Sequence, residues 1–180
     1  MLLSHKTSVK LNINYSNIIG HMCYAAYKLW NVCNYERIHY TELGLDTYPD
    51  WYYQKKSHKD DLWYKNLPSQ TAQEVCKLLD KSWKSFYRLT ETHGIENPHP
   101  PKFKHSKMPV TYMQNGIVHT AGSDTVRLSV SKQMKDYMLN TYNISENYIY
   151  IKNQVFKNTD DIKQIKIYSP VNGNCDIIVI

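Results

Sequence analysis

The chain has 180 residues, a length that fits one domain or two small ones, and 42% of them are hydrophobic, which excludes a chain disordered by composition. Its 22 Lys and Arg residues against 16 Asp and Glu residues give a net charge of +6, a balance that favours polyanionic partners. Because the N-terminus lacks a signal-like apolar segment and no apolar run approaches about 18 residues, we expect a cytoplasmic protein without membrane contact.

The chain opens with a predicted strand and a predicted long helix. Val9–Ile13 alternates apolar and polar residues, as a half-buried strand does. Ser16 or Asn17 can cap a helix that runs from about residue 18 to residue 40, where apolar residues recur at helical spacing. Tyr48–Asn66 is dense in aromatic residues and lysines and contains the run KKSHK. We expect this segment to be a loop with a short helical piece.

Pro68–Leu89 is predicted to be a helix with two different faces, and Thr71 with Glu74 fits the spacing of a capping box at its start. The apolar face is Ala72, Val75, Cys76, Leu79, Trp83 and Phe86, and the polar face is Gln70, Gln73, Lys77, Lys81, Lys84 and Arg88. Cations in a row neutralise phosphates, and amides can reach base edges. A lysine stripe opposite an apolar stripe is also typical of a solvated helix face, so the periodicity alone leaves both interpretations open.

A proline-rich boundary follows this helix at residues 94–109. Within it, PPKFKHSK at residues 100–107 places Lys102, Lys104 and Lys107 around Phe103 on a backbone that prolines keep extended. Such a segment can track phosphates while its aromatic residue stacks on a base. It can equally be a linker whose Phe103 is plugged into the core.

Beyond this boundary the sequence is of strand type, with one short helix. Strands are predicted at Val110–Tyr112, Ile117–Thr120, Thr125–Val130, Tyr148–Ile151, Ile162–Tyr168 and Asp176–Ile180, and a helix at Lys132–Tyr142. The simplest assembly pairs the first strand with these later strands and leaves the helices as an insertion, which makes the fold class α+β. The predicted parts are residues 1–15 (first strand), 16–95 (helical insertion) and 96–180 (remaining strands with a short helix).

The sequence shows no motif of an active site or metal site. Cys23, Cys33, Cys76 and Cys175 form no C-x-x-C pair, and the histidines do not accompany them at zinc-ligand spacing. G-x-S-x-G, H-E-x-x-H, P-loop and G-x-G-x-x-G patterns do not occur. We therefore expect buried, reduced cysteines and predict no catalytic residue, no metal and no cofactor. The sequence leaves the oligomeric state open.

Several segments, taken in order, resemble one protein family. They are LWN at residues 29–31, LPSQTAQEVCKLLDKSWKSFYRL at 67–89, G-x-x-x-P at 94–98 with PPKFK at 100–104, VRLSVSK at 126–132 and IKQIKIYSP at 162–170. In order and spacing, over nearly the whole chain, they resemble the N-terminal half of the OrfB/TnpB family. These proteins are transposon-encoded, RNA-guided DNA nucleases related to the miniature type V CRISPR effectors.

The resemblance implies a small wedge-like β-barrel, made of the first strand plus the C-terminal strands and interrupted by a helical recognition insertion. The family uses this region to hold a guide RNA and to read a short DNA motif beside the target, so DNA and guide-type RNA are the expected partners. By match of motif, Gln73 and Lys77 fall on positions that reach the DNA, and Tyr53 lies in the segment expected beside the same duplex. The candidate nucleic-acid-binding residues are Tyr53, Ser69, Gln70, Gln73, Lys77, Lys81, Lys84, Arg88, Lys102, Lys104 and Arg127.

The chain departs from the family in one respect. Family members continue into a RuvC-like nuclease domain with three metal-binding acids, whereas this sequence stops at Ile180, where that domain is expected to begin. The resemblance therefore implies nucleic-acid binding without cleavage by this polypeptide. Two alternatives stay open: a protein-interaction module that docks through the aromatic stretch Tyr48–Lys56, and a standalone regulator that binds no nucleic acid.

Overall fold

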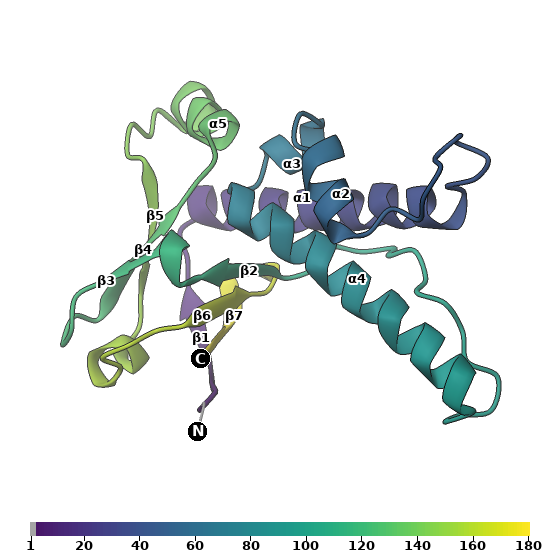
Figure 1. The fold of residues 1–180 in the computed structure, drawn as a ribbon. Coiled ribbons are helices and arrows are strands. Elements are labelled where there is room, and N and C mark those ends of the chain that lie inside the picture. The colour runs from purple at the N-terminus through teal and green to yellow at the C-terminus, as the bar shows by residue number, and fades with distance from the viewer. Residues whose placement is uncertain (1–2) are drawn as a thin grey trace.

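The computed structural model describes residues 3–180 and has an α+β fold, in which one strand is followed by helices and then by the other strands (Figure 1). The helices are α1 (Ile13–Ile38), α2 (Trp51–Ser57), α3 (Leu62–Lys65), α4 (Ser69–Thr92) and α5 (Lys132–Tyr142), with short 3-10 helices η1 (Gln114–Gly116) and η2 (Gln154–Asn158). The strands are β1 (His5–Lys10), β2 (Val110–Met113), β3 (Ile117–His119), β4 (Thr125–Ser129), β5 (Tyr148–Lys152), β6 (Gln164–Ile167) and β7 (Asn174–Val179). Within residues 3–180, no helix combines the length and apolar character needed to cross a membrane.

The first strand and the first helix both begin earlier than the sequence predicts. The expected strand at Val9–Ile13 is wrong in its bounds, because β1 ends at Lys10. Asn12 has an extended backbone, and its side-chain oxygen accepts a hydrogen bond from the Tyr15 N–H at 2.8 Å. This is the N-cap interaction that starts a helix, so α1 begins directly after Asn12 and not after the predicted caps Ser16 or Asn17.

α4 buries the face that its apolar periodicity predicts, and the packing partner of this face includes α1. The predicted capping box is wrong. Pro68 occupies the N-cap position without a side-chain cap, Thr71 is buried in the first turn, and Glu74 forms an ion pair with Lys77. The buried apolar residues are Ala72, Val75, Cys76, Leu79 and Trp83, while Phe86 is partly buried.

The strands form two antiparallel sheets, ordered β1-β7-β6-β2 and β3-β4-β5. β1 pairs with β7 from His5 opposite Val179 to Lys10 opposite Asn174, which confirms that the first strand joins the C-terminal strands. α5 has the predicted bounds, because Ser131 caps it by accepting a hydrogen bond from the Met134 N–H. The sheets therefore bring the two ends of the described chain side by side and leave the helices between them in sequence.

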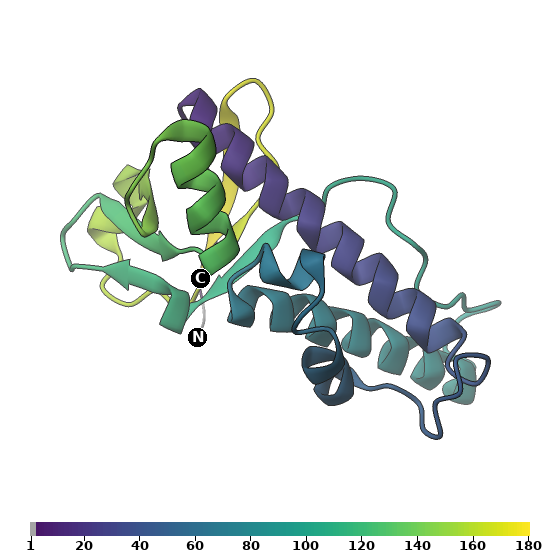
Figure 2. The same ribbon diagram turned by 90° about the horizontal axis from the view of Figure 1, so that it is seen from above.

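The two sheets and the long helices share one hydrophobic core. Tyr112 on β2 is fully buried, and its hydroxyl donates a hydrogen bond to the Ser129 carbonyl at 2.9 Å, which ties the first sheet to the end of β4. α1 runs from the sheets to the far end of the molecule and has α4 beside it (Figures 1 and 2). The four cysteines are buried and free, as predicted.

Candidate nucleic-acid interface

The polar face of α4 is the largest group of predicted residues that the structure keeps on one element. Its buried face fixes the rotation of the helix, so the opposite residues point away from the core. Ser69, Gln70, Lys81, Lys84 and Arg88 are exposed, and Gln73 and Lys77 are half-buried. The helix therefore presents serine and glutamine side chains at its N-terminal end and cations further along.

Two cations on this face are paired with carboxylates of the same helix. The Lys77 ammonium lies 2.8 Å from Glu74, and the Lys84 ammonium lies 2.7 Å from Asp80. Lys81 and Arg88 are exposed and form no ion pair within residues 3–180. The positive charge of the stripe is thus uneven, with Lys81 and Arg88 as its uncompensated cations.

The Asp80 side chain also anchors α4 to α1, and the sequence analysis did not identify this contact. Arg37 and Asp80 are buried and form an ion pair at 3.0 Å, and the Arg37 Nε donates to Gln54 on α2 at 2.9 Å. Burial alone would raise the pKa of Asp80, but hydrogen bonds from Lys84 and Arg37 outweigh burial and lower it. A buried pair of this kind holds three helices in one arrangement beneath the polar face.

Helix α2 lies beside α4 and adds an aromatic ring to the same surface. Two ammonium groups contact the Trp51 ring, with Lys55 at 4.7 Å and Lys77 at 4.9 Å from its centroid. The predicted residue Tyr53 is on this helix and is 43% exposed. Tyr53 and the α4 face are therefore on neighbouring elements, as the site prediction requires.

A hollow of about 920 Å3 lies between α3, the start of α4 and the start of α5. Four lysines line it, with Asp136 as the acidic side chain among its lining residues. Ser69 and Gln73 form part of its wall. The lysines are Lys55, Lys59, Lys65 and Lys132. Lys55 and Lys59 belong to the KKSHK run that the sequence analysis identified. Their proximity to Lys132, about 70 residues further along the chain, depends on tertiary packing and could not be predicted from local patterns.

A smaller hollow of about 330 Å3 borders the other side of the same helix end. Gln70, Gln73 and Lys77 line it together with Asn115 and Lys163, which lie far along the chain on the sheet side. Gln73 lines both hollows. The N-terminal end of α4 thus presents amide groups between a lysine-lined hollow and a second hollow whose two lysines are paired with Glu74 and Asp161, a form suited to insertion into a nucleic-acid groove.

The other predicted residues do not join this surface. Lys102 and Lys104 lie in an extended segment, residues 101–104, which we call the strap. Trp30 donates to the Lys102 carbonyl at 3.1 Å, and the Asn31 amide both donates to the Lys104 carbonyl at 2.9 Å and accepts from its N–H at 2.7 Å. The strap and α2 lie on opposite sides of α1 (Figure 2).

The strap also decides between the two interpretations of Phe103. Phe103 is 39% exposed, so the alternative in which it is plugged into the core is wrong. α1 holds the backbone of the strap and leaves Lys102, Phe103 and Lys104 exposed, with the Lys104 ammonium 4.7 Å from the centroid of the Trp30 ring. Arg127 lies elsewhere again, on the exposed face of β4, with its guanidinium 5.0 Å from the Tyr148 ring centroid.

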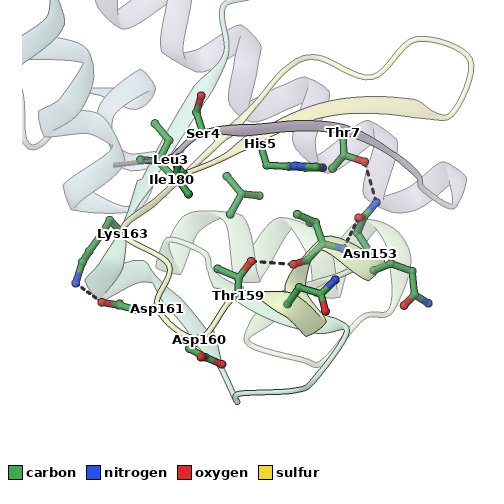
Figure 3. Close-up of a pocket in the computed structure, with 14 residues that line it drawn as sticks. Leu3, Ser4, His5, Thr7, Asn153, Thr159, Asp160, Asp161, Lys163 and Ile180 are labelled. Carbon is green, nitrogen blue, oxygen red and sulfur yellow. Dashed lines mark hydrogen bonds and ion pairs between the residues drawn. The ribbon is translucent and has the colours of Figure 1, made fainter. Parts of the chain in front are cut away.

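The cleft at the chain ends is a third hollow, and it shares Lys163 with the smaller hollow beside α4. It has a volume of about 880 Å3 and lies between β1, β7 and η2, with His5, Thr7 and Asn153 among its lining residues (Figure 3). Asn153 closes one wall by donating to Thr7 and to the Ser8 carbonyl. Within residues 3–180, no group of three or more His, Cys, Asp or Glu side chains is placed to hold a metal ion.

Comparison with protein-family models finds no model that matches this chain, and comparison with curated proteins finds no match.

Proposed function

We propose that this chain is a nucleic-acid-binding module of the TnpB kind, which holds duplex DNA against the polar face of α4 and binds a guide-type RNA at its other basic surfaces. The wedge-like barrel belongs to the same proposal, with the two sheets that share one core as its body. In this account the chain binds and does not cut. Cleavage of DNA by the purified chain with Mg²⁺ would contradict it.

One observation carries the proposal: the surface at the start of α4. Amide side chains that can form paired hydrogen bonds with base edges border a hollow lined with four lysines that can neutralise phosphates. Further along the helix, Lys81 and Arg88 are exposed cations on the same face. The roles divide accordingly, with Gln73 toward bases and Lys81 and Arg88 toward phosphates.

The phosphate role is tested by the salt dependence of duplex binding. A labelled DNA duplex is titrated with the chain by fluorescence anisotropy between about 50 and 200 mM salt. We expect Lys81→Gln and Arg88→Gln each to reduce the slope of log K against log salt by about 0.9. Lys77→Gln should reduce it less, because Lys77 is already paired with Glu74.

Lys10→Gln is the matched control, since Lys10 is an exposed lysine on β1, away from α4. An equal effect of Lys10→Gln, or a wild-type affinity that salt does not change, would rule out α4 as the contact.

The base role is tested separately with a pool of duplex sequences. Gln73→Ala should lower discrimination among them by about 1–3 kcal/mol while leaving the salt slope unchanged.

A protein-interaction module remains the second candidate because two tyrosines of the aromatic stretch are exposed. Tyr52 is 56% and Tyr53 is 43% exposed on α2, and tyrosine is enriched in protein interfaces. If the purified chain binds neither duplex DNA nor RNA and a copurifying protein is released by Tyr52→Ala and Tyr53→Ala together, this alternative replaces the proposed function.

A further inference from the structure

The exposed face of the three-stranded sheet β3-β4-β5 carries planar side chains in register. Val118, Arg127 and Tyr150 lie directly opposite one another across the three strands, so they form one row. Tyr148 lies two residues before Tyr150 and therefore points to the same side of the sheet. We call Val118, Arg127, Tyr148 and Tyr150 the sheet platform.

The core does not explain the platform. The alternate residues of β4 and β5, which face inward, are at most 1% exposed, and they supply the contribution of this sheet to the core. Val118 is 40% and Tyr150 is 39% exposed. The solvent side of a two-faced antiparallel sheet is usually polar, and this row sets an exposed cation between a valine and a tyrosine, a combination complementary to an aromatic, anionic ligand. The inward residues are Val126, Leu128, Ile149 and Ile151.

Within the platform, a cation is stacked on an aromatic ring. The Arg127 guanidinium lies 5.0 Å from the centroid of the Tyr148 ring. This contact orients the guanidinium while leaving Arg127 exposed. Lys152 lies on the same face of β5, opposite Thr125 of β4. Its ammonium is 3.5 Å from the Asp124 carboxylate. The platform itself therefore carries the charge of Arg127, held against one face of the half-buried Tyr148 ring, together with the exposed ring of Tyr150.

We propose that the sheet platform binds single-stranded nucleic acid by stacking unpaired bases on Tyr148 and Tyr150, with Arg127 contacting the intervening phosphate. Tyrosines separated by two strand residues are about 6.6 Å apart along the strand, whereas stacked nucleotides in a duplex are about 3.4 Å apart. Splayed bases match this spacing, and a duplex does not expose its base faces. This site lies on a different element from α4, so it stands whether or not α4 binds duplex DNA.

Two substitutions at one position test the stacking. Labelled ten-nucleotide single strands, one of DNA and one of RNA, are titrated by fluorescence anisotropy. Tyr150→Leu keeps apolar area and removes the ring, and it should weaken binding about 10-fold, within the range for loss of one base–aromatic stack. Tyr150→Phe keeps the ring face and should bind within about twofold of wild type. The two probes also show whether the platform prefers ribose or deoxyribose.

Tyr35→Leu is the matched control, because Tyr35 is an exposed tyrosine on α1 that belongs to none of the binding surfaces named above. It should leave single-strand binding unchanged, and Lys81→Gln should weaken duplex binding only. The platform is not the site if Tyr150→Leu binds the single strands as wild type does, or if Tyr150→Phe loses as much as Tyr150→Leu. It is instead an interface between copies of the chain if Tyr150→Leu abolishes self-association in sedimentation and leaves oligonucleotide binding unchanged.

Discussion

His58 lies between two carboxylates and shows how single residues tie α2 to α1. One ring nitrogen is 3.2 Å from Glu36 on α1, and the other is 2.5 Å from Asp61. Burial alone would lower the pKa of His58, but the hydrogen bonds to Glu36 and Asp61 and their charges outweigh burial and raise it to about 9. His58 is therefore protonated at neutral pH and acts as a buried cation between the helices.

This raised pKa predicts how His58 contributes to stability across the pH range. Because the folded-state pKa lies above the unfolded value of 6.5, the stabilisation is complete below about pH 6.5 and is lost as pH rises through about 9. We expect His58→Gln to lower the free energy of unfolding by roughly 1–3 kcal/mol at pH 6 and by much less at pH 9.5. Urea unfolding of both proteins at the two pH values measures this difference.

The partner carboxylate sets the lower limit of this pH window. Burial would raise the pKa of Glu36, but hydrogen bonds from His58 and Gln54 outweigh burial and lower it. The contribution of Glu36 is therefore present above its ordinary pKa of 4.5 and is lost as pH falls. If His58→Gln lowers the free energy of unfolding as much at pH 9.5 as at pH 6, His58 stabilises the fold by packing and not by charge.

At the scale of elements, the Arg37–Asp80 pair links α1 to α4 beneath the proposed DNA-binding face. Asp80→Asn leaves the buried Arg37 guanidinium without a counter-charge, which should cost about 3–5 kcal/mol of unfolding free energy. Lys84→Gln is the control, because Lys84 contacts the same carboxylate from an exposed position and its loss should therefore lower the unfolding free energy far less. If urea unfolding shows the same decrease in unfolding free energy for both variants, the buried Arg37–Asp80 ion pair does not stabilise the packing of α1 against α4.

The strap is a second element whose position rests on a few side chains of α1. Asn31 makes two of its hydrogen bonds, both to the backbone of Lys104. Asn31→Ala should increase amide hydrogen exchange in residues 101–107 at least 10-fold and lower global stability by only about 1–2 kcal/mol. Mass spectrometry of peptic fragments measures hydrogen exchange in residues 101–107 and in the rest of the chain in one experiment. Unchanged exchange in the strap would mean that Trp30 and Asn34 hold it without Asn31.

These elements show which parts of the fold local patterns can predict. The bounds of α5 and the buried face of α4 were predicted accurately, because both depend on local residue patterns. Asp80 and Arg37 were not recognised as buried, because a charged residue is expected at the surface unless its partner is known, and that partner lies 43 residues away. Local patterns also could not place the strap on the side of α1 opposite α2, since this depends on which side of α1 the backbone follows.

At the scale of the whole molecule, β1 and β7 lie near opposite ends of the sequence and pair with each other. The helices lie between these two strands in sequence. An insertion of this kind could unfold separately from the sheets, as the division at residues 15 and 95 suggests. The packing favours the opposite outcome. Buried residues of α1, α4 and every strand except β3 form one core, and β2 packs directly against α4.

The distribution of natural probes allows a test of this shared core. The four tryptophans lie at residues 30, 51, 63 and 83, so their fluorescence reports on the helices. Cys175 lies on β7, and burial raises the pKa of its thiol to about 12, which protects it from alkylation until the sheet opens. We expect pulse labelling of Cys175 and tryptophan fluorescence to give the same urea midpoint, because a single core unfolds in one step. Labelling of Cys175 at clearly lower urea than the fluorescence transition would instead establish two independently unfolding parts, joined only through the chain.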